Sequence, residues 1–450
     1  MSNLLPLPVA ESETGLQVLK GLLRDRSLLT AMAIMRAEVG PAFQITLPGF
    51  KPAVMVGPNS NRQIMVSQSE HFRWRSPTDP VTKLLRHGLL VEDGQQHAVL
   101  RGEMEPIMQK PRVLPHIPAM QLYTDRVMSH WTDGSVLDML VEMRRAALLI
   151  FMGTLLNVEF GPDMERMWQP ILRTIKYISP GLWIVWPNMP RFGFKKPLAQ
   201  MDEYLYGIIQ ERRNQLKIND ASGSLIKQPP YPDDDLLTHL VCIPSMTDDL
   251  IRDQILTMLI AGHDTSTALL AWSLYLLGQH PEAMKEVVTE VDDVIGEGNL
   301  KEAHLNQLPY LDSFIKETLR LYPPIHVGNR IVAEDTAVSG YELKAGSRVM
   351  ASIYLSHRDE RYWDEPEQFR PERFARDTPK PPPFTYVPFG GGTRACIGAA
   401  FAQIEAKVVL ARILQQFDLQ DVGRKVKPHM GATLEPHPGV FLRVQRRRHG

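Results

Sequence analysis

The sequence predicts a mainly α-helical fold with small β-sheets. Helical hydrophobic patterns dominate the chain, whereas strand-like segments are short and fall in two places, Ala42–Val56 and Thr336–Ala351. Gly340 and Gly346 punctuate the second segment, as expected for a hairpin. No repeat of fixed period and no low-complexity block is found, which argues against solenoid and array folds.

One long helix is expected at the centre of this fold. Its pattern begins after Thr247 and continues to Gly278. A threonine followed by Asp248 and Asp249 is typical of a helix start, because the hydroxyl caps free amides and the acids favour the positive end of the dipole. At about 1.5 Å per residue the helix would be about 45 Å long, enough to cross the molecule and organise one core.

The length and charge of the chain set further limits. With 450 residues it can bury a large core, and we expect one domain over 1–450, in which 1–35 leads into a core of 36–450. Lys and Arg total 50 against 51 for Asp and Glu, a formal net charge of -1. No global field therefore attracts nucleic acid or an anionic bilayer, and we expect no nucleic-acid partner.

Cysteine usage and apolar runs indicate the compartment. The two cysteines, Cys242 and Cys396, are far apart and cannot form a disulfide framework or a cysteine-rich zinc site. The apolar runs Leu28–Met35 and Ala146–Leu156 are shorter than the roughly 20 residues that a membrane helix needs, and the second is typical of a buried core helix. We expect a soluble, cytoplasmic protein with no transmembrane segment.

Two segments lack a clear helical pattern. Ile218–Asp235 is rich in Ser, Gly, Pro and Asp and predicts a solvated loop. Tyr177–Pro197 is rich in proline and aromatic residues, and two readings stay open: a packed interhelix loop, or a mobile apolar rim over a ligand channel. Its aromatic residues include Trp183, Trp186, Phe192 and Phe194.

The most informative segment is Phe389–Gly398, with the sequence FGGGTRACIG, which precedes a helical pattern over 399–417. Its glycines permit close backbone approach to a planar ligand. Amides at the start of the helix would stabilise a thiolate at Cys396 and lower its pKa, so that it could bind iron. An ordinary buried cysteine in a plain loop and a nucleophilic cysteine are the alternatives.

These residues resemble the haem-binding signature of the cytochrome P-450 family, Phe-x-x-Gly-x-Arg-x-Cys-x-Gly, at every specified position. The resemblance implies that Cys396 is the axial thiolate of haem b, iron protoporphyrin IX. It also implies that Phe389, Gly392, Arg394 and Gly398 belong to the cofactor site. The haem would then lie between the long helix and the cysteine loop, as in the soluble bacterial-type members of that family.

Three further motifs extend the resemblance. The first is Glu317-Thr-Leu-Arg320, which is followed by Phe-Arg-Pro-Glu-Arg373-Phe before the cysteine. Read alone, such a Glu–Arg pair is most often a solvated surface pair. The resemblance implies instead that Glu317, Arg320 and Arg373 form a buried network supporting the haem side.

The second motif is Ala-Gly-His-Asp264-Thr265 in the middle of the long helix. Glycine and polar residues are locally unfavourable there, so either a functional reason or a kink with Thr265 bonded back to a carbonyl is expected. By the resemblance, Asp264 and Thr265 deliver protons to the dioxygen that the haem activates, while the thiolate favours O–O cleavage.

The third motif is a set of cations suited to the two haem propionates. His97 and Arg101 are four residues apart on an expected helix and match the family's His-x-x-x-Arg pattern. Arg394 lies inside the cysteine motif, and Arg330 closes Ile-His-Val-Gly-Asn-Arg330. Each could also be a surface cation when read alone.

The function implied by the resemblance is a monooxygenase that inserts one oxygen atom from O2 into an apolar organic substrate, for which we favour a fatty acid or terpenoid. Two departures are minor: Ser266 replaces a common second threonine, and Leu343-Lys-Ala-Gly346 lacks a common proline. The rivals are a peroxide-dependent or isomerising haem-thiolate enzyme, disfavoured by Asp264 and Thr265, and a non-catalytic haem sensor.

Electrons are expected from outside the chain, because no flavin-binding or nicotinamide-binding pattern follows the cysteine helix. The resemblance implies an external ferredoxin or flavodoxin with its reductase, and Lys110, Arg112 and Lys407 could form the docking patch. The residues expected to touch substrate are apolar or small; they are Leu89–Val91, Ile260, Ala261, Ile325–Val327 and Ala432–Leu434.

Overall fold

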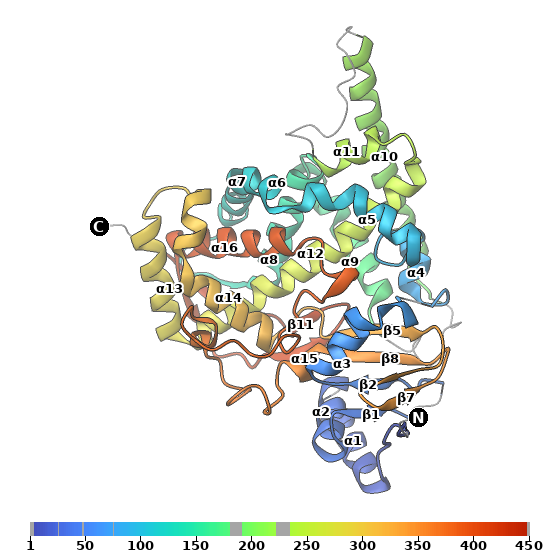
Figure 1. Cartoon of the computed structure of the whole chain (residues 1–450). Helices are drawn as coiled ribbons and strands as arrows, with labels where there is room; N and C mark the ends of the chain where they lie inside the picture. The colour runs from blue at the N-terminus through green and yellow to red at the C-terminus, as the bar shows by residue number, and fades with distance from the viewer. Residues whose placement is uncertain are drawn as a thin grey trace.

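The computed structural model describes residues 4–25, 27–46, 49–74, 76–180, 191–221 and 235–447. Helices make up the larger part, and the strands of a small sheet lie beside them, near the N-terminus (Figure 1). The predicted mainly helical fold with small sheets is confirmed. The α-helices are α1 Ser12–Asp25, α2 Leu28–Val39, α3 Pro58–Arg62, α4 Pro80–Leu85, α5 Gly94–Met108, α6 Lys110–Val113, α7 Ile117–Met128, α8 Met139–Ile150, α9 Met164–Ile178, α10 Lys195–Ala221, α11 Leu236–Cys242, α12 Asp248–Gln279, α13 Pro281–Val294, α14 Pro309–Leu321, α15 Ile353–Ser356 and α16 Ala399–Gln416.

The long central helix is present where it was predicted. In α12, the Thr247 hydroxyl accepts a hydrogen bond from the amide of Leu250 at 3.2 Å, which satisfies one of the free amides at the helix start. Most of its residues are buried, because α12 packs against α8, α10 and α16 (Figure 1). A helix buried along nearly its whole length explains why its sequence lacks a polar face.

The largest sheet combines strands from both ends of the chain, in the order β1-β2-β8-β5-β3. Strands β1 and β2 pair antiparallel within Ala42–Val56, and β2 runs parallel to β8. Both predicted strand regions are confirmed, but the pattern missed β5 and the small C-terminal sheets. The strands are β1 Ala42–Gln44, β2 Ala53–Met55, β3 Phe72–Arg73, β4 Val136–Asp138, β5 Val327–Val332, β6 Thr336–Val338, β7 Tyr341–Leu343, β8 Arg348–Ser352, β9 Phe417–Asp421, β10 Lys427–Met430, β11 Leu434–His437 and β12 Phe441–Arg446.

The hairpin predicted around Gly340 joins β6 to β7. Ser339 and Gly340 form its two-residue turn, and both have positive φ angles, 51° and 87°. Two consecutive positive φ angles match the turn whose twist suits a tight antiparallel pair.

The other segment predictions have mixed outcomes. Ala146–Leu156 is confirmed as buried helix, formed by α8 and a following π-helical turn. The loop predicted for Ile218–Asp235 is wrong over its first four residues, because α10 continues to Ala221 before any Gly or Pro interrupts it. Residues 222–234 and 181–190, the latter with Trp183 and Trp186, lie outside the described residues. Within the described part of the chain, no helix is long and apolar enough to span a bilayer.

Candidate active site

The cysteine segment is a tight loop that enters α16. The amide of Cys396 donates a hydrogen bond to the carbonyl of Phe389 at 2.8 Å, which closes the loop. Gly392 has a φ of +67°, and a Cβ added there would lie 2.3 Å from the carbonyl oxygen of Met65. Only glycine therefore fits this position without moving the backbone. A Cβ at Gly398 would have ordinary contacts, 4.0 Å from the Cys396 sulfur, so protein packing alone does not require glycine there.

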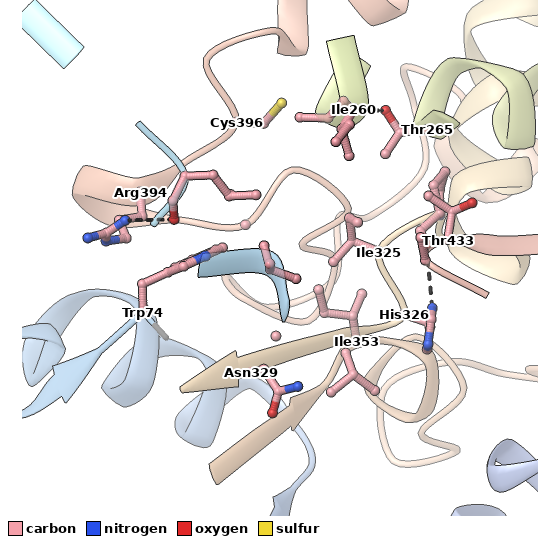
Figure 2. Close-up of a pocket in the computed structure, with 18 of the residues that line it drawn as sticks. Trp74, Ile260, Thr265, Ile325, His326, Asn329, Ile353, Arg394, Cys396 and Thr433 are labelled. Carbon is pink, nitrogen blue, oxygen red and sulfur yellow. Dashed lines mark hydrogen bonds between the residues drawn. The ribbon is translucent and has the colours of Figure 1, made fainter. Parts of the chain in front are cut away.

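The thiol of Cys396 faces a large cavity. The cavity has a volume of about 840 Å³, and Figure 2 shows the sulfur directed toward the side where Ile260 and Thr265 of α12 lie. The thiol is accessible from the cavity although protein atoms surround it on other sides. The other cysteine, Cys242, lies on α11 and is not among the residues that line the cavity. This leaves Cys396 as the thiol that can meet a bound group.

The prediction that the protein itself lowers the pKa of the Cys396 thiol is wrong. Burial raises the pKa of Cys396 above its ordinary value, and the opposing effects of the Gly398 amide and the Arg101 charge are smaller. The helix-start amides act in the predicted direction, but desolvation of the thiolate outweighs them. A bound metal ion removes this penalty, because a coordinating thiol loses its proton.

Four predicted cations line the cavity together. His97 and Arg101 lie one turn apart on α5, Arg394 follows from the cysteine loop, and Arg330 projects from β5. Burial, followed by the positive charges of Arg394 and Arg101, lowers the pKa of His97 to about 4, so its imidazole is neutral at neutral pH and acts as a hydrogen-bonding group. The guanidinium carbons of Arg330 and Arg394 lie 3.7 and 5.1 Å from the ring centroid of Trp74, which orients both.

The three arginines already have protein partners, and Arg330 donates to the carbonyl of Asn329 at 2.7 Å. Arg101 donates to the carbonyl of Ala395 at 2.8 Å and to Glu105, and Arg394 pairs with the carboxylate of Asp93. The cations are thus held in place before any ligand binds. The donor set fits a haem, because a thiol faces the cavity and a cluster of carboxylate-binding side chains lines it.

The polar pair on α12 lies in the cavity wall. The hydroxyl of Thr265 donates to the carbonyls of Ala261 at 2.6 Å and Gly262 at 3.2 Å, so the back-bonded geometry expected of the structural alternative is present. Thr265 also lines the cavity, and the lone pairs of its oxygen can accept a hydrogen bond. Asp264 is fully buried and accepts a hydrogen bond from Thr433 at 2.9 Å. Burial, and then the nearby carboxylate of Glu435, raise the pKa of Asp264 well above its ordinary value.

The profile of the family described as Cytochrome P450 matches residues 15–443, nearly the whole chain, which includes the thiol loop, the cation cluster and the polar pair. The chain belongs to the cytochrome P450 family. Members of this family use haem b with an axial cysteine thiolate, and they are monooxygenases. The cofactor of this cytochrome P450 is therefore haem b, with Cys396 as its axial ligand.

Relatives of this cytochrome P450 occur in distant organisms. Cytochrome P450 4V2 of Homo sapiens is 36% identical over 306 residues, which are 64% of this chain. That alignment spans 58% of the length of the human protein. Cytochrome P450 139 of Mycobacterium tuberculosis is 29% identical over 428 residues, covering 90% of this chain and 95% of that protein.

Solved structures with the same fold cover the whole molecule. The heme domain of cytochrome P450DA superposes with a TM-score of 0.82 at 24% identity, over 99% of this chain and 97% of that one. Retinoic acid bound cyanobacterial CYP120A1 superposes with a TM-score of 0.81 at 24% identity, over 99% and 100% of the two chains. At this identity the similarity establishes the fold.

The Glu–Arg network of this cytochrome P450 is buried, as the resemblance implied. Arg320 donates to both carboxylate oxygens of Glu317, at 2.7 and 2.8 Å, and both side chains are fully buried. The guanidinium nitrogen Nε of Arg373 lies 3.4 Å from Glu317. Arg320 also donates to the carbonyls of His357, Pro366 and Gln368, which satisfies its guanidinium group, whereas Nε of Arg373 has no hydrogen-bond partner among the described residues.

Most predicted substrate contacts line the cavity, but two do not. Val91 and Leu434 are buried in the core and are not among the lining residues. Leu434 points away because side chains alternate along an extended segment, so its neighbour Thr433 faces the cavity. The residues that do line it include Leu89, Leu90, Ile260, Ala261, Ile325, His326, Val327 and Ala432.

Sequence reasoning missed a second buried acid in the cavity wall. Glu405 on α16 accepts a hydrogen bond from Ser266 at 2.5 Å, and burial raises the pKa of Glu405 to about 8. A glutamate within an otherwise apolar face of the helix after Cys396 was the available signal. The acid will hold its proton at neutral pH, so it acts as a neutral polar group.

The prediction that Lys407 belongs to a docking patch for the redox partner is wrong. Lys407 is 14% exposed, and its ammonium group pairs with Asp312 at 2.7 Å. It contributes to internal packing and offers little charge to a partner. Lys110 and Arg112 lie on α6, which packs against α16, and Lys110 is exposed.

Proposed function

We propose that this cytochrome P450 is a monooxygenase that inserts one oxygen atom from O2 into an apolar organic substrate. The observation that carries the proposal is the Cys396 thiol, which faces a cavity of about 840 Å³ across from the apolar and hydroxyl side chains of α12. A thiolate and a proton-donating pair on opposite walls are what the reaction needs: electron density on one side and protons on the other.

When bound, haem b supplies the activation of O2 and the transfer of one oxygen atom. In this proposal His97, Arg101, Arg330 and Arg394 would bind its two propionates and fix its orientation. Phe389, Gly392 and Gly398 shape the loop from which the sulfur of Cys396 would bind the iron.

In this proposal Asp264 and Thr265 of α12 supply protons to the cavity. The Thr265 hydroxyl already donates to its own helix, so its free lone pairs would hold a water molecule in the cavity as a proton donor. Asp264, which has a raised pKa, would release and regain protons near neutral pH. Apolar side chains such as Leu89 and Ile260 exclude other water and so keep protons from being lost in side reactions.

For the substrate we propose a fatty acid or a terpenoid acid. Most of the cavity wall is apolar, and exposed Lys51 also lines it, which offers an ammonium group to a carboxylate. The cyanobacterial neighbour of the same fold was solved with retinoic acid, a ligand of this chemical kind.

The partner we propose is an external ferredoxin or flavodoxin with its reductase, which docks near Lys110 and Arg112. Charge reversal at both, Lys110→Glu with Arg112→Glu, should raise the apparent KM for the partner severalfold at low salt, because surface charges mainly steer association. Lys407→Gln is the control, since that charge is already paired. An unchanged KM in the double variant would contradict docking at this surface.

The function is tested by optical titration of the ferric protein, followed by turnover under labelled O2. Fatty acids and terpenoid acids should shift the haem from low to high spin, and one labelled oxygen atom should appear in the product. Matched alcohols should bind more weakly than the acids, and Lys51→Met should remove that difference. Product formed with peroxide but never with electron donors would contradict the proposal.

A further inference from the structure

A charged cluster lies behind the wall of the cavity, where three elements meet. Asp264 comes from α12, Arg144 from α8 and Glu435 from β11. Arg144 forms an ion pair with Glu435, and its guanidinium nitrogen also lies 4.0 Å from Oδ1 of Asp264. One arginine thus faces two carboxyl groups, which leaves the three residues with a net negative charge when both acids are ionised.

The two acids differ in their access to water. The side chain of Asp264 is 2% exposed, whereas that of Glu435 is 22% exposed. Oδ1 of Asp264 receives no hydrogen bond from a described residue, although its other oxygen accepts from Thr433. A buried carboxyl oxygen without a donor, beside a second carboxyl group, is satisfied when the pair shares a proton.

We propose that Glu435 takes protons from solvent and passes them to Asp264, while Arg144 holds the two carboxyl groups together. The inference rests on the proposed monooxygenase function. Insertion of one oxygen atom consumes O2, two electrons and two protons, and releases one water molecule. Each proton that leaves Asp264 toward the cavity is replaced by the proton of Glu435, and Glu435 regains its proton from solvent water.

Backbone contacts hold this route in a fixed position. The indole of Trp272 donates to the carbonyl of Leu434 at 2.8 Å, and the amide of Leu434 donates to Pro324 at 2.9 Å. These bonds fix the strand residue next to Glu435 against α12. Glu435 touches neither the cavity nor the cofactor cluster, so it is a positioning and relay residue rather than a catalytic one.

The other titratable groups around Asp264 and Glu435 do not take up the proton that these two acids share. On α12, the imidazole of His263 contacts the carbonyl of Arg144 at 3.1 Å, and burial lowers the pKa of His263 to about 3, so it stays neutral. Asp138 interacts with Arg144 from the start of α8, and exposed His429 is the cross-strand partner of Glu435. The nearby acid of the wall, Glu405, bonds to Ser266 instead.

The experiment compares Glu435→Gln and Glu435→Asp with Glu159→Gln, which removes a different glutamate–arginine ion pair, the one with Arg126. Infrared spectra of the ferric haem protein, with isotope-labelled aspartate, follow the protonation of Asp264 against pH. Glu435→Gln should lower the Asp264 midpoint by roughly one pH unit, because a neighbouring negative charge is lost. Glu435→Asp should have an Asp264 midpoint close to that of wild type, and Glu159→Gln should leave the midpoint unchanged.

The kinetic readout separates a relay from a structural role. In Glu435→Gln the rate of product formation per bound haem should fall about tenfold, with a larger solvent deuterium isotope effect and an unchanged substrate spin shift. A wild-type rate and isotope effect in this variant would overturn the proposal, as would an unchanged Asp264 midpoint. If the wild-type protein forms no product with electron donors, the proposed function fails, whereas the Asp264 midpoint still tests the coupling of the two acids.

Discussion

Two buried carboxylate–arginine clusters in this molecule are built in opposite ways. In the network of α14, Glu317 accepts from Arg320 and from the amide of Arg370, and Arg320 also donates to three carbonyls. In the cluster behind the cavity, Oδ1 of Asp264 and Nε of Arg144 have no hydrogen-bond partner among the described residues.

The difference indicates what each cluster can do. A buried ion pair with satisfied donors and acceptors is locked in one protonation state, so it suits a structural support. A buried acid with an unsatisfied oxygen changes protonation more easily, which suits proton movement. We therefore expect substitutions in the first cluster to reduce stability strongly, and those along the cavity wall to change titration or coupling with smaller losses of stability.

The largest effect is expected from Glu317→Ala. This change leaves the fully buried guanidinium of Arg320 without its carboxylate, which should cost about 3–5 kcal/mol of unfolding free energy and most of the bound haem. Urea unfolding and the haem content of the purified protein measure both. Glu372→Ala, at an exposed position of the same region, is the control. Near-wild-type stability in Glu317→Ala would show that the network is not a support.

The next largest effect is expected in the cysteine loop, from Gly392→Ala. The new Cβ would combine a strained φ of +67° with a contact of 2.3 Å to the carbonyl of Met65, and should cost about 2–3 kcal/mol and weaken haem retention. Gly390→Ala is a matched control, since its φ is +69° but its nearest contact is 3.9 Å. Equal losses in the two variants would mean that backbone strain alone accounts for the effect.

An intermediate effect is expected from Glu405→Gln, and it depends on pH. The pKa of Glu405 is about 8 in the folded protein against an ordinary value of 4.5. Between these values the unfolded chain loses this proton and the folded chain keeps it, so stability falls as pH rises through that window. Glutamine removes this dependence, so the stability of Glu405→Gln relative to wild type should rise by about 3 kcal/mol from pH 5 to pH 8.

Urea midpoints across this pH range measure the Glu405 effect. Ser266→Ala is the companion variant, because its lost hydrogen bond stabilised the charged form of Glu405 and the fall with pH should persist. Parallel pH curves for wild type and Glu405→Gln would show that Glu405 is ionised in the folded protein.

The sequence anticipated the parts of the site that are local. The capped start of α12 and the glycine-rich loop before Cys396 each depend on residues close together in the chain, so the pattern was sufficient. Strand β5 was missed because its pairing with β8 depends on a partner about twenty residues away, and its own sequence contains Gly328 and Asn329.

The charged cluster behind the cavity wall could not be predicted for a related reason. Arg144, Asp264 and Glu435 meet only when three distant segments pack together, and Arg144 lies just before the run Ala146–Leu156 that was predicted as buried helix. The thiol pKa was predicted in the wrong direction because burial, a property of the whole fold, outweighs the local helix-start effect.

The smallest effect on stability, and the sharpest on coupling, is expected from Thr265→Ala. The hydroxyl bonds back to Ala261, a contact that adds little to helix stability, and alanine is the better helix former, so unfolding should change by less than about 0.5 kcal/mol. Haem should bind normally, while electrons are lost as hydrogen peroxide because the water that supplies protons is no longer held. The ratio of product to electron donor consumed, measured beside peroxide release, tests this role.

Thr267→Ala, which removes a similar hydrogen bond to the carbonyl of His263 from a buried position of α12, is the control. If Thr265→Ala keeps the wild-type ratio, the hydroxyl has only the structural role of its helix bond, and Asp264 must reach the cavity without it.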